Sequence, residues 1–265
     1  MNRIDSVANE KVKLAVKIAD SSKARKANKM FFLEGLRLCK DAAITGVEIE
    51  YAFFTEAALE KFKDDVAFIC ENANQSYLVS AAVADKLSQT QSSQGFFCTC
   101  KLKDDDITAT VKENGKYIAL ENIQDPANLG AICRTAEALG LDGAIIFSGC
   151  DIYSPKAQRA AMGSLLRLSI IVTDNLKAEL LNCSKKGMKV FATTPDSSVL
   201  RITNTDMNGG VVAVIGNEGN GVSEEIFSVC EKITIPMLGR AESLNASMAA
   251  AITMWEMVRH GEVKL

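Results

Sequence analysis

The chain has 265 residues, of which 48% are hydrophobic and 24% are charged, so it is long enough to bury a core in one or two domains. It contains neither an uncharged apolar run of membrane-spanning length nor a basic leader followed by an apolar stretch, which argues against a membrane or secreted protein and favours the cytoplasm. The eight scattered cysteines predict reduced, mostly buried thiols, because their one close pair, Cys98 and Cys100, lacks the spacing of a zinc knuckle. The single histidine is His260, and no metal site is expected.

The net charge of −3 is unevenly distributed along the chain. Residues 1–40 hold ten basic and four acidic side chains, a net +6 that leaves −9 for the remainder. A positive segment on an acidic body could contact phosphates, and its basic side chains include Lys23, Arg25, Lys26 and Lys29. A solvated helical face explains this composition equally well, so charge alone leaves both interpretations open.

The N-terminal third predicts short helices that alternate with short strands. Helices are expected at 11–19 and 36–43, and strands at 30–33, 51–54 and 67–69. A polar loop at 88–95 then precedes the apolar run 96–100. The stretch 101–115 is rich in charge and poor in large apolar residues, so we place the domain boundary there and expect domains at 1–105 and 116–265.

The second domain shows apolar runs of strand length separated by segments of helix length. The runs are Tyr117–Leu120, Ala144–Phe147, Leu168–Val172, Lys189–Ala192, Val211–Ile215 and Ile233–Ile235. This pattern predicts an α/β domain whose parallel sheet is covered by helices on both faces. Such sheets bind ligands beyond the carboxyl ends of their strands, so the loops after these runs are the expected site.

The loop 121–130 follows the first of these strands. Asn128 is predicted to cap the helix that follows, because its side chain can accept a hydrogen bond from a free first-turn amide. Arg134 lies about one helical turn further on, where its guanidinium could reach a phosphate or a ribose. Taken singly, an ordinary cap and a surface cation explain both residues.

The loop 216–221 holds three glycines between a strand and a helix expected to start near Ser223. Glycines let backbone amides approach a ligand closely, but their spacing differs from the dinucleotide fingerprint and no Walker lysine is present. Glu218 would also repel a phosphate, so a nucleotide-like ligand without phosphates fits better. A plain glycine turn capped by Ser223 remains an alternative.

The segment 235–247 leads into a helix expected at 248–259. Ser243, Asn245 and Ser247 gather polar groups at the helix start, where free amides and the helix dipole favour polar atoms. By itself this pattern is also typical of a well-capped core helix.

In this order and spacing, the three segments resemble the signature of the SpoU (TrmH) family of RNA 2′-O-ribose methyltransferases. The matching residues are Asn128-x-Gly130 with Arg134-Thr135, Gly216-Asn217-Glu218-Gly219-x-Gly221, and Ile235-Pro236-Met237 with Ser243-Leu244-Asn245-x-Ser247. They span nearly all of residues 117–259. The first part of the chain resembles that family's RNA-binding domain, with Phe32-Leu33-Glu34-Gly35 and the loop ending in Gly95 as weaker markers.

This resemblance implies a fold, a cofactor and a partner. The fold is α/β, with a C-terminal parallel-sheet SPOUT domain that contains a deep trefoil knot, preceded by a smaller α/β (L30e-like) RNA-binding domain. The cofactor is S-adenosylmethionine, no metal is required, and the active form is a homodimer through the C-terminal domain. The implied cofactor-binding residues, together with the adjoining Thr193 and Pro195, are Thr194, Gly216, Asn217, Gly219, Ile235, Met237, Leu244, Asn245 and Ser247.

The resemblance also implies catalytic roles. Arg134 would help to deprotonate the ribose 2′-hydroxyl, while Asn128, Glu218, Ser243 and Asn245 would orient the site. A free arginine stays protonated at neutral pH, so a base at this position needs a large shift of its pKa or help from the substrate phosphate.

The expected substrate is large-subunit (23S) ribosomal RNA, because relatives with this additional N-terminal domain generally resemble ribosomal RNA enzymes. A tRNA substrate is the alternative, and the choice between a housekeeping and an antibiotic-resistance role stays open. A non-catalytic ribosome assembly factor would be expected to lack motif residues, all of which are present. A small-molecule methyltransferase would need a glycine-rich loop after the first strand, but residues 121–130 hold one glycine.

Overall fold

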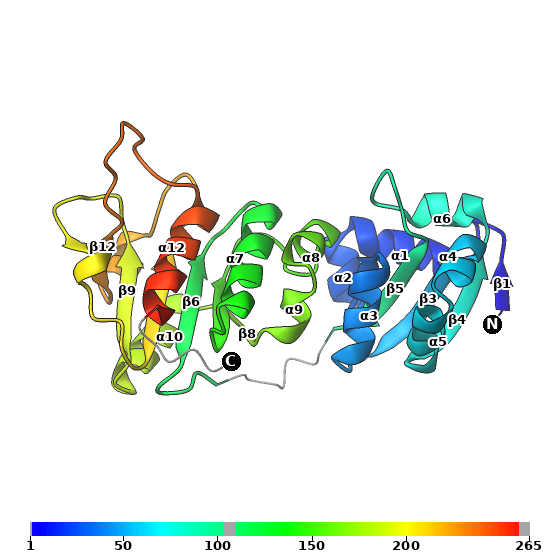
Figure 1. Ribbon diagram of the computed structural model, residues 1–265, viewed down its shortest axis with the longest axis horizontal. Coiled ribbons are helices and arrows are strands. Elements are labelled where there is room, and N and C mark those ends of the chain that lie inside the picture. Colours follow the sequence, from blue (N-terminus) through cyan, green and yellow to red (C-terminus); the bar gives the residue numbers. More distant parts are fainter. Residues whose placement is uncertain (1, 103–109, 260–265) are drawn as a thin grey trace. The chain divides into compact units, whose positions relative to one another are not determined.

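The structure is a computed structural model that describes residues 2–102 and 110–259. The chain divides into two compact units, of which one holds Met1–Ile107 with Asp151–Arg167, and the other holds Thr108–Cys150 with Leu168–Leu265 (Figure 1). Much of the stretch 101–115, where we expected the boundary, lies outside the described residues, so the limits 1–105 and 116–265 stay a prediction. The grouping of Asp151–Arg167 with the N-terminal unit was not predicted.

The N-terminal unit is built on a five-stranded mixed sheet with the order β1-β4-β3-β5-β2. Its strands are β1 (Asn2–Ile4), β2 (Met30–Glu34), β3 (Ile49–Thr55), β4 (Ala73–Val79) and β5 (Phe96–Lys101). Its helices are α1 (Glu10–Asp20), α2 (Ser22–Asn28), α3 (Leu36–Ile44), α4 (Glu56–Lys61), α5 (Lys63–Glu71), α6 (Ala81–Leu87), α8 (Pro155–Ala161) and α9 (Ser164–Arg167). Strand β5 runs antiparallel to β2 and β3, whereas β4 runs parallel to β1 and β3.

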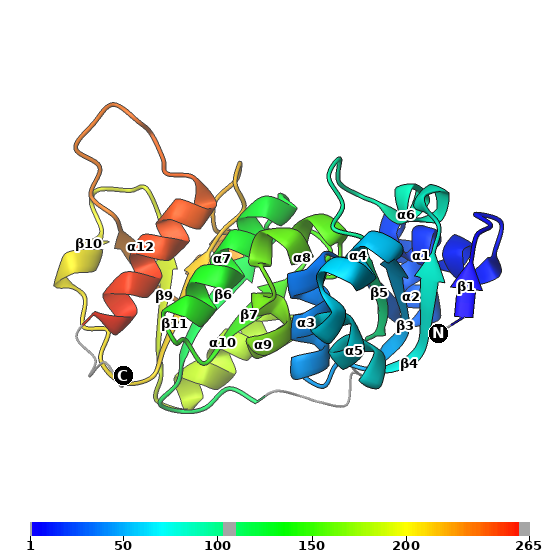
Figure 2. The same ribbon diagram turned by 45° about the vertical axis from the view of Figure 1, so that its right-hand side comes forward.

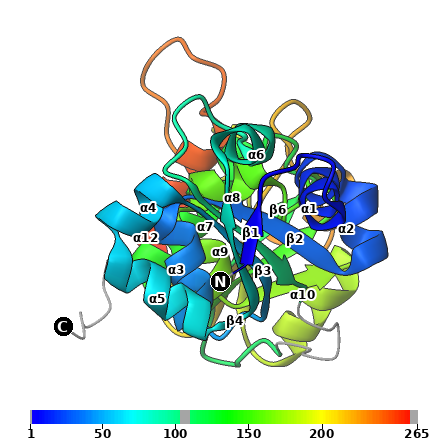
Figure 3. The same cartoon turned by 90° about the vertical axis from the view of Figure 1, so that its right-hand side faces the viewer.

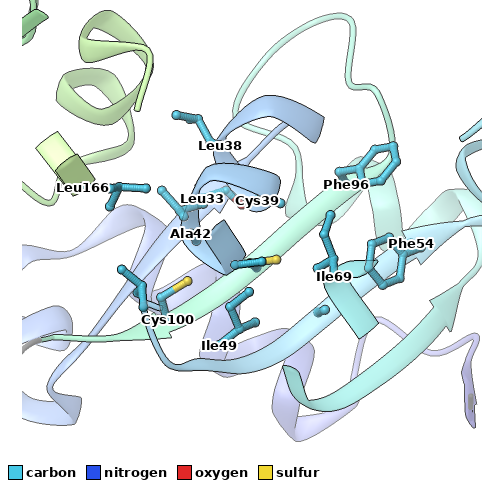
Figure 4. Packing of buried hydrophobic residues seen from close by; sticks show 14 of the residues in the cluster. Leu33, Leu38, Cys39, Ala42, Ile49, Phe54, Ile69, Phe96, Cys100 and Leu166 are labelled. Atoms are coloured by element: carbon cyan, nitrogen blue, oxygen red, sulfur yellow. Dashed lines mark hydrogen bonds between the residues drawn. The ribbon is translucent and has the colours of Figure 1, made fainter. Parts of the chain in front are cut away.

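Both faces of this sheet are buried. Because successive strand residues point to opposite faces, Phe31 and Phe54 pack on one side and Phe32 and Phe53 on the other. The first face packs against α3 and α5, and Leu166 of α9 joins the same cluster (Figures 3 and 4). Two-sided burial explains why β2 and β5 are almost continuously apolar.

The strand that we expected at 67–69 is wrong. These residues lie in α5, where Val66 and Ile69 are buried one helical turn apart and Asp64 and Asp65 occupy the first turn. The neighbouring strand is β4, whose polar start conceals it in the sequence. None of the eight cysteines forms a disulfide and five are buried, as expected.

The C-terminal unit is built on a seven-stranded sheet with the order β10-β12-β9-β11-β6-β7-β8, and every pair in it is parallel. Its strands are β6 (Lys116–Glu121), β7 (Gly143–Phe147), β8 (Ile170–Thr173), β9 (Lys189–Thr193), β10 (Leu200–Arg201), β11 (Val211–Ile215) and β12 (Glu231–Thr234). Its helices are α7 (Pro126–Ala138), α10 (Leu176–Lys185), η1 (Ile202–Asn204), α11 (Glu224–Phe227) and α12 (Ala246–Val258). The six predicted strands are thus confirmed, and β10 is an addition.

Helices cover this second sheet on both faces, as predicted. On one face, α10 and α11 pack on alternate residues of the strands, such as Tyr117 and Ile145. Helices α7 and α12 pack against each other and against β6, β7 and β11 (Figure 2). Within the described ranges, no helix is long and apolar enough to span a bilayer.

Candidate functional site

Four adjacent parallel strands bring the predicted segments to one edge of the C-terminal sheet. Strands β12, β9, β11 and β6 are neighbours, and their carboxyl ends point the same way. The loops after them begin at Ile235, Thr194, Gly216 and Asn122. Segments far apart in the sequence therefore meet where parallel sheets bind ligands.

A pocket of about 310 Å³ lies among these loops. It is lined by Thr193, Thr194, Pro195, Ile215, Gly216, Asn217, Glu218, Gly219, Asn220, Gly221, Val222, Phe227, Ile235, Met237, Ser243, Leu244, Ala246 and Ala249. Seven of the nine residues predicted to bind a cofactor are in this lining, whereas Asn245 and Ser247 are not. The volume suits a small organic ligand. Glu218 is the one charged side chain in this lining, so the pocket suits a ligand without phosphates.

The glycine loop at 216–221 is a closed turn. Asn217 and Gly221 exchange backbone hydrogen bonds of 3.0 and 2.9 Å, and the Asn217 side-chain oxygen accepts from the amides of Gly219 and Asn220. A Cβ atom on Gly216 would come within 2.3 Å of the backbone of Gly221 and Val222. Gly216 is therefore needed for this close backbone approach.

Three predicted catalytic residues form one hydrogen-bonded network across the three segments. The Asn128 amide donates to Glu218 at 3.0 Å, and its oxygen accepts from the Asn245 amide at 3.2 Å. Asn245 in turn accepts from the backbone amide and hydroxyl of Ser247. The network connects the start of α7, the glycine loop and the start of α12, so these residues shape the site by holding its loops together.

Glu218 is the anion of this network. Its carboxylate also accepts from the backbone amides of Gln124 and Asp125, at 3.0 and 3.1 Å. Partial burial opposes ionisation, but these hydrogen bonds and the one from Asn128 outweigh it and lower the pKa of Glu218. Glu218 is thus held as a carboxylate.

The predicted cap at Asn128 is wrong. Helix α7 begins at Pro126 and is capped by Asp125, whose carboxylate accepts from the Ala127 amide at 3.0 Å. Proline favours the first helical position and keeps the preceding residue extended, which places the cap at Asp125. Asn128 therefore lies inside the first turn, where it is 9% exposed and free to join the network.

The remaining catalytic predictions lie at the surface. Arg134 is exposed on α7, and Ser243 is exposed and lines the pocket. Asn245 caps α12 by accepting from Ser247 and Met248, as its position at the helix start suggested. Their chemical roles remain proposals.

Arg25 is corrected from an RNA contact to a structural residue. Its guanidinium is 5% exposed, pairs with Asp151 at 2.8 Å and donates to the carbonyls of Ile18 and Ala19. Its burial and these hydrogen bonds argue against contact with a phosphate. The other three predicted RNA contacts, Lys23, Lys26 and Lys29, have exposed side chains.

Several site residues escaped the sequence reasoning. Asn220, Phe227 and Ala249 line the pocket, and the buried Glu121 ends β6 and accepts two hydrogen bonds from Ser223. Glu121 carried a usable signal, since it is a charge at the end of an apolar strand. Among the residues that the structure describes, no cluster of three or more His, Cys, Asp or Glu side chains could hold a metal ion.

Known proteins share both parts of this architecture. A model described as the SpoU rRNA Methylase family matches residues 115–255, and one described as the MRM3-like substrate binding domain matches residues 9–98. The 23S rRNA (guanosine(2553)-2′-O)-methyltransferase RlmP of Bacillus subtilis is 27% identical over 259 residues, which cover 97% of this chain and 99% of that protein.

Solved structures agree with these matches. An AdoMet-bound rRNA methyltransferase from Sinorhizobium meliloti has a TM-score of 0.86 and 26% identity, with 98% of each chain covered. The SpoU methyltransferase AviRb from Streptomyces viridochromogenes, in complex with AdoMet, shares the fold with a TM-score of 0.83 at 22% identity, over 95% of this chain and 97% of that one.

The fold defines an α/β protein with a pocket of ligand size at the carboxyl ends of its parallel strands. The chain belongs to the SpoU rRNA methylase family.

Proposed function

We propose that this protein transfers a methyl group from S-adenosylmethionine to a ribose 2′-hydroxyl of large-subunit ribosomal RNA. Membership of the SpoU family makes it an RNA methyltransferase that uses S-adenosylmethionine. The observation that carries the finer proposal is the pocket at the ends of β9, β11 and β12. Its lining of backbone and neutral side chains, with one carboxylate, suits an adenosyl group beside a positively charged sulfonium.

The cofactor residues act mainly by shape. The loop from Gly216 to Gly219 offers closely packed backbone, while Ile235, Met237 and Leu244 provide apolar contacts and Thr194 a hydroxyl. Asn245 and Ser247 fix the start of α12 beside the pocket. When bound, S-adenosylmethionine supplies the methyl group on a sulfonium whose positive charge disappears on transfer.

Arg134 is assigned the role of helping to remove the proton from the ribose 2′-hydroxyl. Its exposed guanidinium can pair with an RNA phosphate and hold it against the ribose, so that a phosphate oxygen accepts the 2′-hydroxyl proton; Arg134 accepts that proton itself only as the neutral guanidine. With S-adenosylmethionine bound, the ribose oxygen would take the methyl group from sulfur, and sulfur would keep the electron pair of the broken carbon–sulfur bond. Asn128, Glu218 and Asn245 hold the surrounding loops, and Ser243 contributes a hydroxyl at the pocket. Positioning should dominate this displacement.

RNA attraction is assigned to the surface of the N-terminal unit. The match to a substrate-binding domain over residues 9–98 and the exposed lysines of α1 and α2 support this assignment. The ribosomal target is suggested by RlmP, which is named for a guanosine 2′-hydroxyl of 23S rRNA.

A homodimer through the C-terminal domain is part of the proposal. Met248, Ile252 and Trp255 form an apolar stripe along α12 and are 54%, 39% and 55% exposed. Large apolar side chains in such a row are typical of a protein interface. The deep trefoil knot and the cytoplasmic location remain expectations from the family.

Methyl transfer to fractionated RNA tests the proposal. The protein is incubated with methyl-labelled S-adenosylmethionine and, in separate reactions, with unmodified transcripts of large-subunit rRNA, small-subunit rRNA and tRNA. Label in the large-subunit RNA supports the proposal, whereas label confined to tRNA favours the alternative substrate. Absence of label from every fraction would favour a non-catalytic RNA-binding protein.

A further inference from the structure

Glu121, the last residue of β6, holds one end of the glycine loop. Its side chain is buried, with 7% of the residue exposed. One carboxylate oxygen accepts the backbone amide of Ser223 at 2.9 Å, and the other accepts the Ser223 hydroxyl at 2.6 Å. Ser223 follows the loop and caps α11 through a hydrogen bond from the amide of Ile226. The carboxylate therefore determines where the loop joins the helix.

The other end of the glycine loop is attached to Asn122, the residue directly after Glu121. The Asn217 amide donates to the carbonyl of Asn122 at 2.9 Å, and Asn122 has a left-handed φ of 58°. Between these two anchors, the Asn217–Gly221 pair closes the loop on itself. The loop is thus a closed unit attached at both ends to two consecutive residues, Glu121 and Asn122.

The bonds to Glu121 are suited to hold this unit in place. Hydrogen bonds to an ionised acceptor in a dry environment are stronger than neutral ones. Glu121 provides such an environment because it is buried at the end of β6. Every residue from Gly216 to Val222 lines the pocket, so a displaced loop would displace much of the wall.

We propose that Glu121 is a positioning residue for cofactor binding. It holds the glycine loop at 216–221 and the adjoining Ser223 in place before the cofactor binds, so that binding requires little ordering of the chain. The inference rests on the proposed function, because it takes S-adenosylmethionine as the ligand. Glu121 acts through Ser223 and touches no reacting atom, so its loss should weaken cofactor binding and leave the chemical step intact.

The chain offers a matched control in Glu34, which ends β2 of the N-terminal unit. Glu34 is 6% exposed and also accepts one backbone amide, that of Gln89 at 2.9 Å, and one hydroxyl, that of Thr90 at 2.7 Å. Glu34→Ala removes the same kind of buried carboxylate without touching the pocket. Comparing it with Glu121→Ala separates positioning of the cofactor loop from general loss of stability.

The experiment measures the Kd of S-adenosylmethionine by calorimetry, together with KM for the cofactor, kcat and the melting temperature. Glu121→Ala should raise the Kd and KM about tenfold while kcat at saturation changes less than about twofold. Glu121→Gln should recover binding to within about threefold, because its amide can accept from the Ser223 amide and donate to the hydroxyl. Glu34→Ala should leave the Kd unchanged.

Two results would overturn the inference: a folded Glu121→Ala that binds the cofactor like the wild type, or a Glu34→Ala that weakens binding equally. If Glu121→Ala does not fold, Ser223→Ala provides the test, since it keeps the carboxylate and removes the hydroxyl that bonds to Glu121 and caps α11. It should raise the Kd about threefold, and an unchanged Kd would contradict the proposal. If the wild-type protein itself does not bind S-adenosylmethionine, the proposed function falls first and this inference with it.

Discussion

The two units differ in what lies at the carboxyl ends of their strands: a loop of the unit itself in the N-terminal sheet and a pocket in the C-terminal sheet. In the N-terminal unit, the loop before the antiparallel strand β5 is hydrogen-bonded to this edge. Its Gly95 carbonyl accepts from the amide of Thr55 at the end of β3, and its Gln89 amide donates to the carboxylate of Glu34 at the end of β2. In the C-terminal unit every strand pair is parallel, and a pocket lies among the loops that follow β9, β11 and β12. An all-parallel sheet thus leaves its edge available for a ligand, whereas the antiparallel strand brings its own loop there. We accordingly assign the cofactor to the C-terminal unit and RNA attraction to the surface of the N-terminal unit.

The largest effect should come from Arg134→Ala, which tests whether the chemistry resides in the C-terminal unit. We expect the rate of methyl transfer to fall about 10²–10⁴-fold, because the 2′-hydroxyl loses the group that helps to remove its proton. The Kd values for S-adenosylmethionine and RNA should change little. Single-turnover kinetics measure the rate, with Arg201→Ala, an exposed arginine on β10, as the control. An unchanged rate would exclude the catalytic role.

Gly216→Ala should have the next largest effect. The added Cβ would overlap the backbone of Gly221 and Val222, so the loop must move and cofactor binding should weaken more than about tenfold. The free energy of unfolding should also fall by about 1–3 kcal/mol. Calorimetry and thermal melting measure the two effects. Gly239→Ala is the control, because a Cβ there meets no atom within 4 Å; equal behaviour of the two variants would show that the close approach at Gly216 is unimportant.

Replacing Lys23, Lys26 and Lys29 by glutamine tests whether the N-terminal surface attracts RNA. RNA affinity should fall, and the slope of its salt dependence should flatten by about 0.7–0.9 for each RNA phosphate that a lysine no longer neutralises. The control replaces Lys61, Lys63 and Lys185, exposed lysines on or beside other helices, with the same change in charge. Titrations at several salt concentrations measure both, and an unchanged slope would mean that the basic segment is only a solvated face.

Arg25→Ala should behave differently from those lysine variants, although Arg25 lies on the same helix as Lys23 and Lys26. Removing it leaves Asp151 without its buried partner, which should cost about 3 kcal/mol of folding free energy. The salt slope of the folded protein should stay that of the wild type. Denaturant unfolding and RNA titration measure the two effects. A flatter salt dependence of RNA affinity with normal stability would show that Arg25 contacts RNA after all.

The smallest effect concerns Glu218 and pH. Its pKa in the folded protein lies below the usual 4.5, so its hydrogen bonds stabilise the fold above that pH and the contribution is lost as pH falls through the folded-state pKa. The melting temperature of Glu218→Gln should therefore lie below that of the wild type at neutral pH, and the gap should narrow on acidification. Melting curves over this range measure the gap, and a gap independent of pH would contradict the assignment.

The sequence predicted the parallel sheet well because its strands are buried on both faces and appear as continuous apolar runs, as at Val211–Ile215. It failed where local pattern and tertiary environment disagree. Asn74, Gln75 and Ser76 make the first half of strand β4 polar and conceal it, while the apolar residues of α5 resemble a short strand in the sequence.

The site shows the same limit. The loops were predictable because parallel strands bring their carboxyl ends together, but the partners of individual side chains were not. Arg25 meets Asp151 across 126 positions of sequence, and Glu121 meets Ser223 across 102. The cap at Asp125, by contrast, could have been predicted locally, from Pro126 directly after it.

The central claim, that the protein methylates ribose, is tested most directly by alkaline hydrolysis of RNA labelled by the enzyme. Alkali cleaves RNA only through a free 2′-hydroxyl, so a methylated ribose protects the bond that follows it. We predict that the label from S-adenosylmethionine is recovered in alkali-resistant dinucleotides, and that Arg134→Ala abolishes it. Label recovered in mononucleotides would show methylation of a base and would contradict the account.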